Sequence, residues 1–578
     1  MCGINFIYSK KSALNIKSIE EMMQATQHRG PDFSKAILIN SQVGMAHNRL
    51  SILDLSENAN QPFVINNRYY LTYNGEIYNY KALRNNLEKS AITFSTNSDT
   101  EVLARLLIQK GKDAIPELEG MFAFVFYDSQ ENSFITSRDY FGIKPLYYYE
   151  DDYVILISSE AKGLFASGYI TKELNEEGIN DYLNFKYVTS NNTIFKNILS
   201  LHPKEILVSN NSEISIHQYN KTPFSGTKQV IQEKVREDIK TTLISDVPLG
   251  VFLSGGIDSL LIYETIKKKT NQPLTCFYIN LDKDIEEENK LKQLCNNHGD
   301  TLHCITFETD FENNFRLFIQ TLDTPIADSA SFLTWLLSKK AKEKGIKTIL
   351  SGVGGDEQFA GYNRHYAFSV YLKWKNFIST PFLKQLGLDS LFSGGKKRLV
   401  KKLISDISVD PNSTWNNFIR LNLPHKTTLL QTQYIASLNE AIQHDQSNYL
   451  AKDVLAVSDQ SGMAHGVEIR VPLLYSRFDI DSHFLLQHGK KWILKELIVT
   501  PSGTKKGFGI FLSQEILNKP FFKEQLQLLK NPNHIIYKYL FFDKTQALIK
   551  NHISGKNNYS PEIWALIIIT CWLNQTFD

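Results

Sequence analysis

Two glycines join a short apolar strand to a helix in the segment Val251-Phe252-Leu253-Ser254-Gly255-Gly256-Ile257-Asp258-Ser259. Glycines let a backbone approach an anion closely, and the N–H groups of the loop and of the helix N-terminus supply positive potential. Asp258 is placed to hold Mg²⁺ beside bound phosphates, because hard cations prefer carboxylate oxygen. The segment lacks the Gly-x-x-x-x-Gly-Lys-Ser/Thr pattern of a Walker loop. It therefore predicts a phosphate-binding turn of another kind, with a purely structural turn as the alternative.

A second loop of related composition, Ser351-Gly352-Val353-Gly354-Gly355-Asp356-Glu357, follows another predicted strand. In a doubly wound sheet the carboxyl ends of the strands line the ligand crevice. We therefore expect Asp258 and Asp356 to lie at one edge of the sheet, where they can share a metal ion. Two unrelated acidic turns are the alternative.

The residues around these loops alternate between strand and helix patterns, which predicts a parallel, doubly wound sheet. From about residue 371 onward, helical patterns dominate. The predicted strands are residues 251–253, 274–280 and 348–351, and the predicted helices are residues 230–245, 260–269, 286–298 and 333–344.

The first 210 residues have a different pattern, with many short apolar or alternating runs separated by Asn, Asp and Gly. They predict a layered α+β domain with much sheet. A polar stretch at residues 217–228, with Pro223 and Gly226, is interpreted as the linker to the second half. The predicted strands are residues 35–40, 69–73, 122–127, 133–137 and 153–158, and the predicted helices are residues 18–27 and 99–110.

The chain opens Met1-Cys2-Gly3-Ile4, so removal of the initiator Met leaves Cys2 as the N-terminus. Its thiol titrates near ~8.5 and its α-amine near ~8 in model peptides. An amine that is partly neutral at pH 7 can take the thiol proton, which places a nucleophile and its base in one residue. A cysteine at position two by chance is the alternative.

Chain length, net charge, cysteine content and apolar segments indicate a multidomain protein of a reducing compartment. A length of 578 residues indicates two or three domains, and a net charge of +2 argues against nucleic-acid or membrane binding. Five cysteines without a framework spacing fit a reducing compartment. No signal peptide is visible, and the apolar residues 563–573 are too short to span a bilayer and fit a buried helix. We expect a cytoplasmic protein.

Taken together and in order, many short motifs resemble the glutamine-dependent asparagine synthetase family over nearly the whole chain. The resemblance implies a class II glutamine amidotransferase domain of the αββα N-terminal nucleophile type at residues 2–210. It implies an ATP pyrophosphatase-type synthetase domain at residues 228–578, and a homodimer is a further family expectation. The matching segments are residues 1–4, 28–32, 47–52, 73–79, 98–101, 120–124, 138–139, 245–248, 254–259, 351–357, 361–362 and 468–472.

For the first half, the resemblance implies that Cys2 attacks the carboxamide of glutamine and releases ammonia. It assigns the oxyanion hole to Asn74 and Gly75, the glutamine α-carboxylate to Arg49 and its α-ammonium to Asp99. Considered singly, these residues could be a surface ion pair, a hairpin turn and a helix cap. The remaining residues implied to line the glutamine pocket are Leu50, Ser51, Ile52, Leu53 and Glu76.

For the second half, the resemblance implies that the side-chain carboxylate of aspartate attacks the α-phosphorus of ATP. Ammonia arriving through an internal tunnel then displaces AMP. Mg²⁺ on Asp258 and Asp356 would neutralise charge on the pyrophosphate, and Lys505 would stabilise the phosphoryl group, although a solvated basic turn is its alternative. The implied ATP contacts are Leu253, Ser254, Gly255, Gly256, Asp258, Ser259, Ile279, Ser351 and Gly352.

Val353 is the main departure from the family, which usually has Glu or Asp at this position. Valine can neither accept a proton nor bind a metal, so another carboxylate such as Glu357 substitutes, or the synthetase step is altered. Three readings stay open: asparagine synthesis, amidation of another carboxylate on a sugar, peptide or other metabolite, and a glutaminase with an inactive synthetase half. Aspartate-dependent pyrophosphate release separates the first two, and ATP binding without turnover would support the third.

Overall fold

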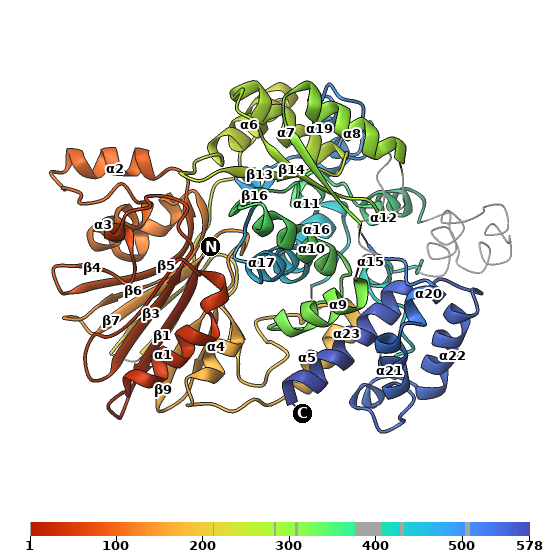
Figure 1. The fold of residues 1–578 in the computed structure, drawn as a ribbon, viewed down its shortest axis with the longest axis horizontal. Helices are drawn as coiled ribbons and strands as arrows, with labels where there is room; N and C mark the ends of the chain where they lie inside the picture. Colours follow the sequence, from red (N-terminus) through yellow and green to blue (C-terminus); the bar gives the residue numbers. More distant parts are fainter. Residues whose placement is uncertain are drawn as a thin grey trace.

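The structure is a computed structural model that describes residues 2–211, 213–281, 285–306, 310–375, 407–427, 433–502 and 509–577. A strand-rich first half lies beside a second half that is built around one parallel sheet (Figure 1).

The first half contains two six-stranded antiparallel sheets that pack face to face. Phe6 and Met45 from one sheet meet Val125 and Phe134 from the other in a shared apolar cluster. The first sheet has the order β10 (Leu199–Ser200), β8 (Tyr147–Glu150), β9 (Val154–Ser158), β1 (Gly3–Ser9), β3 (Val43–Arg49) and β2 (Phe33–Leu38). The second has the order β12 (Glu213–Gln218), β11 (Glu205–Asn210), β7 (Ser133–Arg138), β6 (Gly120–Asp128), β5 (Tyr69–Ile77) and β4 (Phe63–Ile65).

Helices cover the outer faces of both sheets, which gives the expected αββα layers. α1 (Ile16–Ala25) and α4 (Ala161–Ala166) pack on the first sheet. α3 (Asp99–Lys110) packs on the second sheet, with α2 (Tyr80–Lys89) against it. The prediction of a helix at residues 99–110 is confirmed, and the five predicted strands overlap β2, β5, β6, β7 and β9.

The second half contains a five-stranded sheet whose described pairings are all parallel. On β14, Cys276 and Tyr278 face one apolar cluster while Phe277 and Ile279 face another, so the sheet is buried on both sides as a doubly wound fold requires. Its order is β15 (Thr301–Ile305), β14 (Thr275–Ile279), β13 (Leu249–Phe252), β16 (Thr348–Leu350) and β17 (Glu468–Arg470).

Helices pack on both faces of this sheet. α6 and α7 lie on one side, and α10 and α17 on the other (Figure 1). The helices of this half include α6 (Lys228–Thr241), α7 (Ile257–Lys269), α8 (Ile285–Asn297), α9 (Phe311–Thr321), α10 (Ala330–Glu343), α11 (Gly355–Gln358), α12 (Asn363–Trp374), α15 (Pro411–Ile419), α16 (Leu438–His444), the π-helix η5 (Asp445–Val454), α17 (Leu455–Met463), α19 (Trp492–Lys495), α21 (Pro520–Leu528), α22 (Phe542–Ile553) and α23 (Ser560–Phe577).

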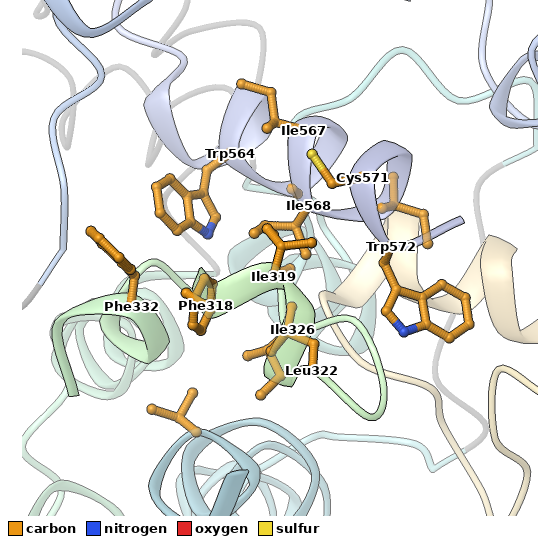
Figure 2. Close-up of a cluster of buried hydrophobic side chains, with 14 of the residues drawn as sticks. Phe318, Ile319, Leu322, Ile326, Phe332, Trp564, Ile567, Ile568, Cys571 and Trp572 are labelled. Carbon is orange, nitrogen blue, oxygen red and sulfur yellow. The ribbon is translucent and has the colours of Figure 1, made fainter. Parts of the chain in front are cut away.

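The C-terminal helix α23 is a core element. Figure 2 shows Trp564 and Ile568 of this helix facing Phe318, Ile319 and Phe332 of α9 and α10. Residues 563–573 are almost fully buried, which confirms the predicted buried helix. Within the described ranges, no helix has both the length and the apolarity needed to cross a membrane.

Candidate active sites

Cys2 lies directly before β1, at a small cavity between the two halves of the molecule. Its backbone N–H donates to Asn74 Oδ1 at 2.8 Å. The other end of this amide, Asn74 Nδ2, is buried and has no hydrogen-bond partner among the described residues. An unused donor beside a nucleophile suits a developing oxyanion. Two predicted residues are not part of the cavity lining: Asn74, which meets Cys2 through this backbone hydrogen bond, and Ser51, which donates its N–H to Asp32. The predicted residues that do line the cavity are Cys2, Arg49, Leu50, Ile52, Leu53, Gly75, Glu76 and Asp99.

Asn74 and Gly75 lie within strand β5, so the alternative that they form a hairpin turn is wrong. Gly75 is required there because a Cβ at this position would lie 2.1 Å from the Met121 carbonyl oxygen. The close approach of β6 thus excludes a side chain at this position of the cavity wall.

Arg49 forms the positive end of the cavity. Its Nη1 donates to Ser56 O at 2.9 Å and to Asn60 Oδ1 at 2.7 Å, and its Nη2 contacts the carbonyl oxygens of Leu53 and Asp54. These partners are neutral and the side chain is 5% exposed, so the alternative of a surface ion pair is wrong. A guanidinium held in this way keeps its charge for an anionic ligand.

Asp99 and Glu76 form a negative end. Asp99 Oδ2 accepts hydrogen bonds from Tyr73 Oη at 2.8 Å and Ile77 N at 3.0 Å. The side chain that caps α3 is Ser98, so capping does not explain Asp99. Glu76 Oε1 is buried without a hydrogen-bond partner among the described residues. Burial raises the pKa of both carboxyl groups.

The Cys2 thiol is not activated by its surroundings alone. Burial raises the pKa of this thiol, and the opposing effects of the chain's amino terminus, the Leu50 backbone and Arg49 do not offset it. A nucleophilic role for this thiol would therefore need a base, and the α-amine of Cys2 would be one if Met1 is removed.

The loop after β13 begins the second candidate site. Gly255 adopts φ +66°, a conformation that favours glycine. Ser254 N donates to Ser259 Oγ at 3.1 Å, and this hydroxyl donates to Gly256 O at 3.1 Å, which holds the turn above α7. The predicted contacts Leu253 and Ile279 lie on adjacent chain segments at the carboxyl ends of β13 and β14. Ser351 and Gly352 follow β16 at the same edge of the sheet.

Asp258 and Asp356 converge on one point, as predicted. Lys491 Nζ lies 2.6 Å from Asp356 Oδ1 and also contacts Asp258 Oδ2, and Lys491 is 4% exposed. Burial lowers the pKa of Lys491, but the two carboxylates outweigh it and raise the pKa overall. A cation already sits between two hard oxygen donors, so the pair fits Mg²⁺, which takes its other ligands from phosphate and water.

Three glycines make room for these carboxylates. A Cβ on Gly352 would lie 2.6 Å from Asp258 Cβ, and a Cβ on Gly355 would lie 2.6 Å from Asp258 Oδ1. A Cβ on Gly361 would lie 1.9 Å from Asp356 Oδ1. Sequence reasoning missed Lys491; the only local signal is the Lys490-Lys491 pair. The predicted Lys505 lies outside the described residues.

Val353 is half-buried and packs against the apolar cluster that contains Leu474. Glu357 is 1% exposed, and it accepts a hydrogen bond from Tyr362 Oη. Burial, reinforced by Asp356, raises the pKa of Glu357 to about 7. Glu357, the carboxyl group named as one possible substitute for an acid at Val353, thus lies beside Asp356 and within the core.

Two buried ion-pair networks join the halves. Arg29 donates to Glu160 at 2.7 Å and to both oxygens of Asp459 at 2.9 Å. Arg470 Nη2 donates to Glu76 Oε2 at 3.0 Å. The second network reaches the cavity at Cys2, because Glu76 is one of the residues that line this cavity.

Comparison with known proteins agrees with this architecture. Residues 1–220 match the family described as glutamine amidotransferase domain, and residues 230–574 match the family described as asparagine synthase. An "Asparagine synthetase [glutamine-hydrolyzing] 1" of Bacillus subtilis is 27% identical over 99% of this chain and 96% of its own length. A "Putative asparagine synthetase [glutamine-hydrolyzing] 2" of Methanocaldococcus jannaschii is 33% identical over 63% of this chain and 76% of its own. An "Amidase chry2" of Gibberella zeae is 28% identical over 64% and 60%. The chain belongs to the asparagine synthase family and carries an N-terminal glutamine amidotransferase domain.

Proposed function

We propose that this protein transfers the amide nitrogen of glutamine to a carboxylate that it activates with ATP, and that the acceptor is aspartate. The observation that carries this proposal is the cavity at Cys2, which has Arg49 at its positive end and Asp99 and Glu76 at its negative end. Such a cavity suits the two charges of an α-amino acid while leaving its side chain at the nucleophile.

In the first half-reaction, the Cys2 sulfur attacks the amide carbon of glutamine and its proton passes to the α-amine. This requires that Met1 is removed. Asn74 Nδ2 and the Gly75 N–H stabilise the negative oxygen. The amine then protonates the leaving nitrogen, ammonia departs, and water hydrolyses the thioester to glutamate.

In the second half-reaction, the acceptor carboxylate attacks the α-phosphorus of ATP and pyrophosphate leaves. Ammonia attacks the resulting acyl-adenylate at carbon and AMP leaves. Mg²⁺, held by Asp258 and Asp356, would neutralise the pyrophosphate when bound. Lys491 lies within reach of the same charge, so we infer that it moves from the carboxylates to the phosphates.

Amidation of a different carboxylate is the second candidate. Two observations favour it: Val353 stands where the family usually has an acid, and one relative bears the name amidase. Both candidates use the same chemistry at Cys2 and at the nucleotide loops, and they differ only in the acceptor.

Pyrophosphate release with ATP, Mg²⁺ and ammonium, measured with and without aspartate, tests the acceptor. We expect stimulation by aspartate, with one asparagine formed per pyrophosphate. Glutamine hydrolysis without any aspartate-dependent pyrophosphate would contradict aspartate as the acceptor, and a screen of sugar, peptide and other carboxylic acids would follow.

A further inference from the structure

One wall of the Cys2 cavity comes from the other half of the chain. Glu468, on strand β17 of the parallel sheet, lines the same cavity as Cys2, Arg49 and Asp99. It is 1% exposed, and its charge acts on the Cys2 thiol and on Asp99. Glu468 begins one of the segments that match the family, residues 468–472, and the resemblance implies no role for it.

The negative end of the cavity therefore holds three carboxyl groups, those of Asp99, Glu76 and Glu468, and Arg470 pairs with the last two. Arg470 Nε donates to Glu468 Oε1 at 2.7 Å, and Arg470 Nη2 donates to Glu76 Oε2 at 3.0 Å. The third guanidinium nitrogen, Nη1, donates to the carbonyl oxygens of Thr242 at 2.8 Å and Ile244 at 2.5 Å. Arg470 therefore orients two of the three carboxyl groups at this end.

The two carboxyl groups that share Arg470 are not equivalent. Burial raises the pKa of Glu76 despite Arg470. Burial acts in the same direction on Glu468, but the chain's amino terminus, Arg470 and Lys144 lower its pKa to about 2. The two carboxyl groups that share Arg470 therefore have pKa values shifted in opposite directions.

We propose that Glu468 belongs to the glutamine site, where its carboxylate, oriented by Arg470, attracts the α-ammonium group of the substrate together with Asp99 and Glu76. This inference rests on the proposed function of the Cys2 cavity. It makes the first half-reaction depend on a residue of the synthetase half.

The strand that carries Glu468 is fixed to the nucleotide site. β17 pairs with β16 in the register Glu468 to Thr348 and Arg470 to Leu350, and Ser351 N donates to Arg470 O at 2.9 Å. The residue that faces glutamine and the loop that faces ATP therefore share one rigid pair of strands.

The test compares glutamine with 4-carbamoylbutanoate, an analogue that lacks only the α-amino group. Glu468→Gln keeps the shape and an oxygen acceptor for Arg470 but removes the charge. We expect kcat/KM for glutamine hydrolysis to fall about tenfold or more, mainly through KM, while the value for the analogue changes less than about threefold. If the analogue turns over too slowly, its inhibition constant against glutamine is compared instead.

Two further variants serve as controls for Glu468→Gln. Glu468→Asp retains the charge and should recover part of the loss. Glu119→Gln removes an exposed carboxylate that contacts Tyr475 across the same interface, and it should change neither substrate's kinetics. Ammonia-dependent pyrophosphate release in Glu468→Gln reports whether the second half remains folded.

An equal loss for glutamine and the analogue would overturn the inference, because Glu468 would then act on Cys2 or on the fold. No loss for glutamine would overturn it as well. A wild-type protein that does not hydrolyse glutamine at all would instead contradict the proposed function.

Discussion

Lys491 occupies the position between Asp258 and Asp356 that a divalent cation would share. Without its ammonium group the two carboxylates would lose a buried cationic partner, and removal of one partner of a buried ion pair is destabilising. We expect Lys491→Met to destabilise the metal-free protein by about 2 kcal/mol. Added Mg²⁺ should recover part of this loss by binding the folded state.

Thermal unfolding with and without Mg²⁺ measures both effects. Lys490→Met is the matched control, because Lys490 Nζ contacts Asn363 rather than the acidic pair. Equal midpoints for wild type and Lys491→Met in the absence of metal would contradict this view of the site.

His47 should make the protein sensitive to acid. It is fully buried on β3, its Nδ1 lies 3.0 Å from Thr72 Oγ1, and burial, with Arg49 and the amino terminus, lowers its pKa to about 3. The pKa of a histidine in the unfolded state is near ~6.5. As the pH falls from this value towards the folded-state pKa, the unfolded state binds a proton that the folded state does not, so the free energy of unfolding decreases. At pH 4.5 the loss relative to pH 7 is about 2 kcal/mol.

Denaturant unfolding of wild type and His47→Gln at pH 7 and pH 4.5 checks this. The variant should lose about 2 kcal/mol less than wild type over this interval, whereas His217→Gln, at an exposed site, should lose as much as wild type. Parallel losses in all three proteins would show that His47 does not carry the acid sensitivity.

At the scale of elements, the loop after α11 leaves no room for a side chain at Gly361. A Cβ there would lie 1.9 Å from Asp356 Oδ1 and 2.3 Å from Lys491 Cε. Gly361→Ala should therefore displace the acidic pair and lower ammonia-dependent pyrophosphate release at least about tenfold, an effect of roughly 1.4 kcal/mol. Glutamine hydrolysis at Cys2 should stay within about twofold of wild type. A variant that releases pyrophosphate normally would argue against a tight acidic pair.

The elements differ in how well the sequence predicts them. The helix predicted at residues 99–110 has the observed bounds of α3, which the Ser98 side chain caps and which ends before Gly111. β1 and β3 were not predicted, because all seven residues of each are buried between helices and the facing sheet, which removes the alternation that marks a half-exposed strand. β17 is a three-residue strand and is too short to carry a pattern.

The same limit applies to the sites. Motif order placed Cys2, Arg49 and Asp99 together, and the structure brings them to one cavity. Lys491 lies 233 residues from Asp258 in sequence, and Glu468 reaches the cavity only because the second half packs on the first. Contacts of this kind arise from tertiary packing, so no local pattern marks them.

At the scale of the whole molecule, the two halves are joined by a buried charge cluster. Arg29 is fully buried and has bidentate contact with Asp459, a residue of α17 in the other half. Asp459→Ala should lower the free energy of unfolding by about 3 kcal/mol or more, because it leaves a buried guanidinium short of one partner. Lys347→Gln, which breaks the exposed pair with Asp32 across the same interface, should cost less than about 1 kcal/mol.

Chemical denaturation of both variants measures this contrast. Similar losses for the buried and the exposed pair would mean that burial of Arg29 does not govern how the halves are held together.

In the function proposed for the whole chain, nitrogen released from glutamine at Cys2 is consumed at the nucleotide site of the same chain. The most direct measurement supplies amide-¹⁵N glutamine, ATP, Mg²⁺ and aspartate, and compares wild type with Cys2→Ala by mass spectrometry of the amide product. We expect this transfer to give ¹⁵N-labelled asparagine with AMP and pyrophosphate from wild type, and from Cys2→Ala no label but normal product once ammonium is added. Labelled product from Cys2→Ala, or glutamate released by wild type with no nitrogen transferred to any carboxylate offered, would contradict it.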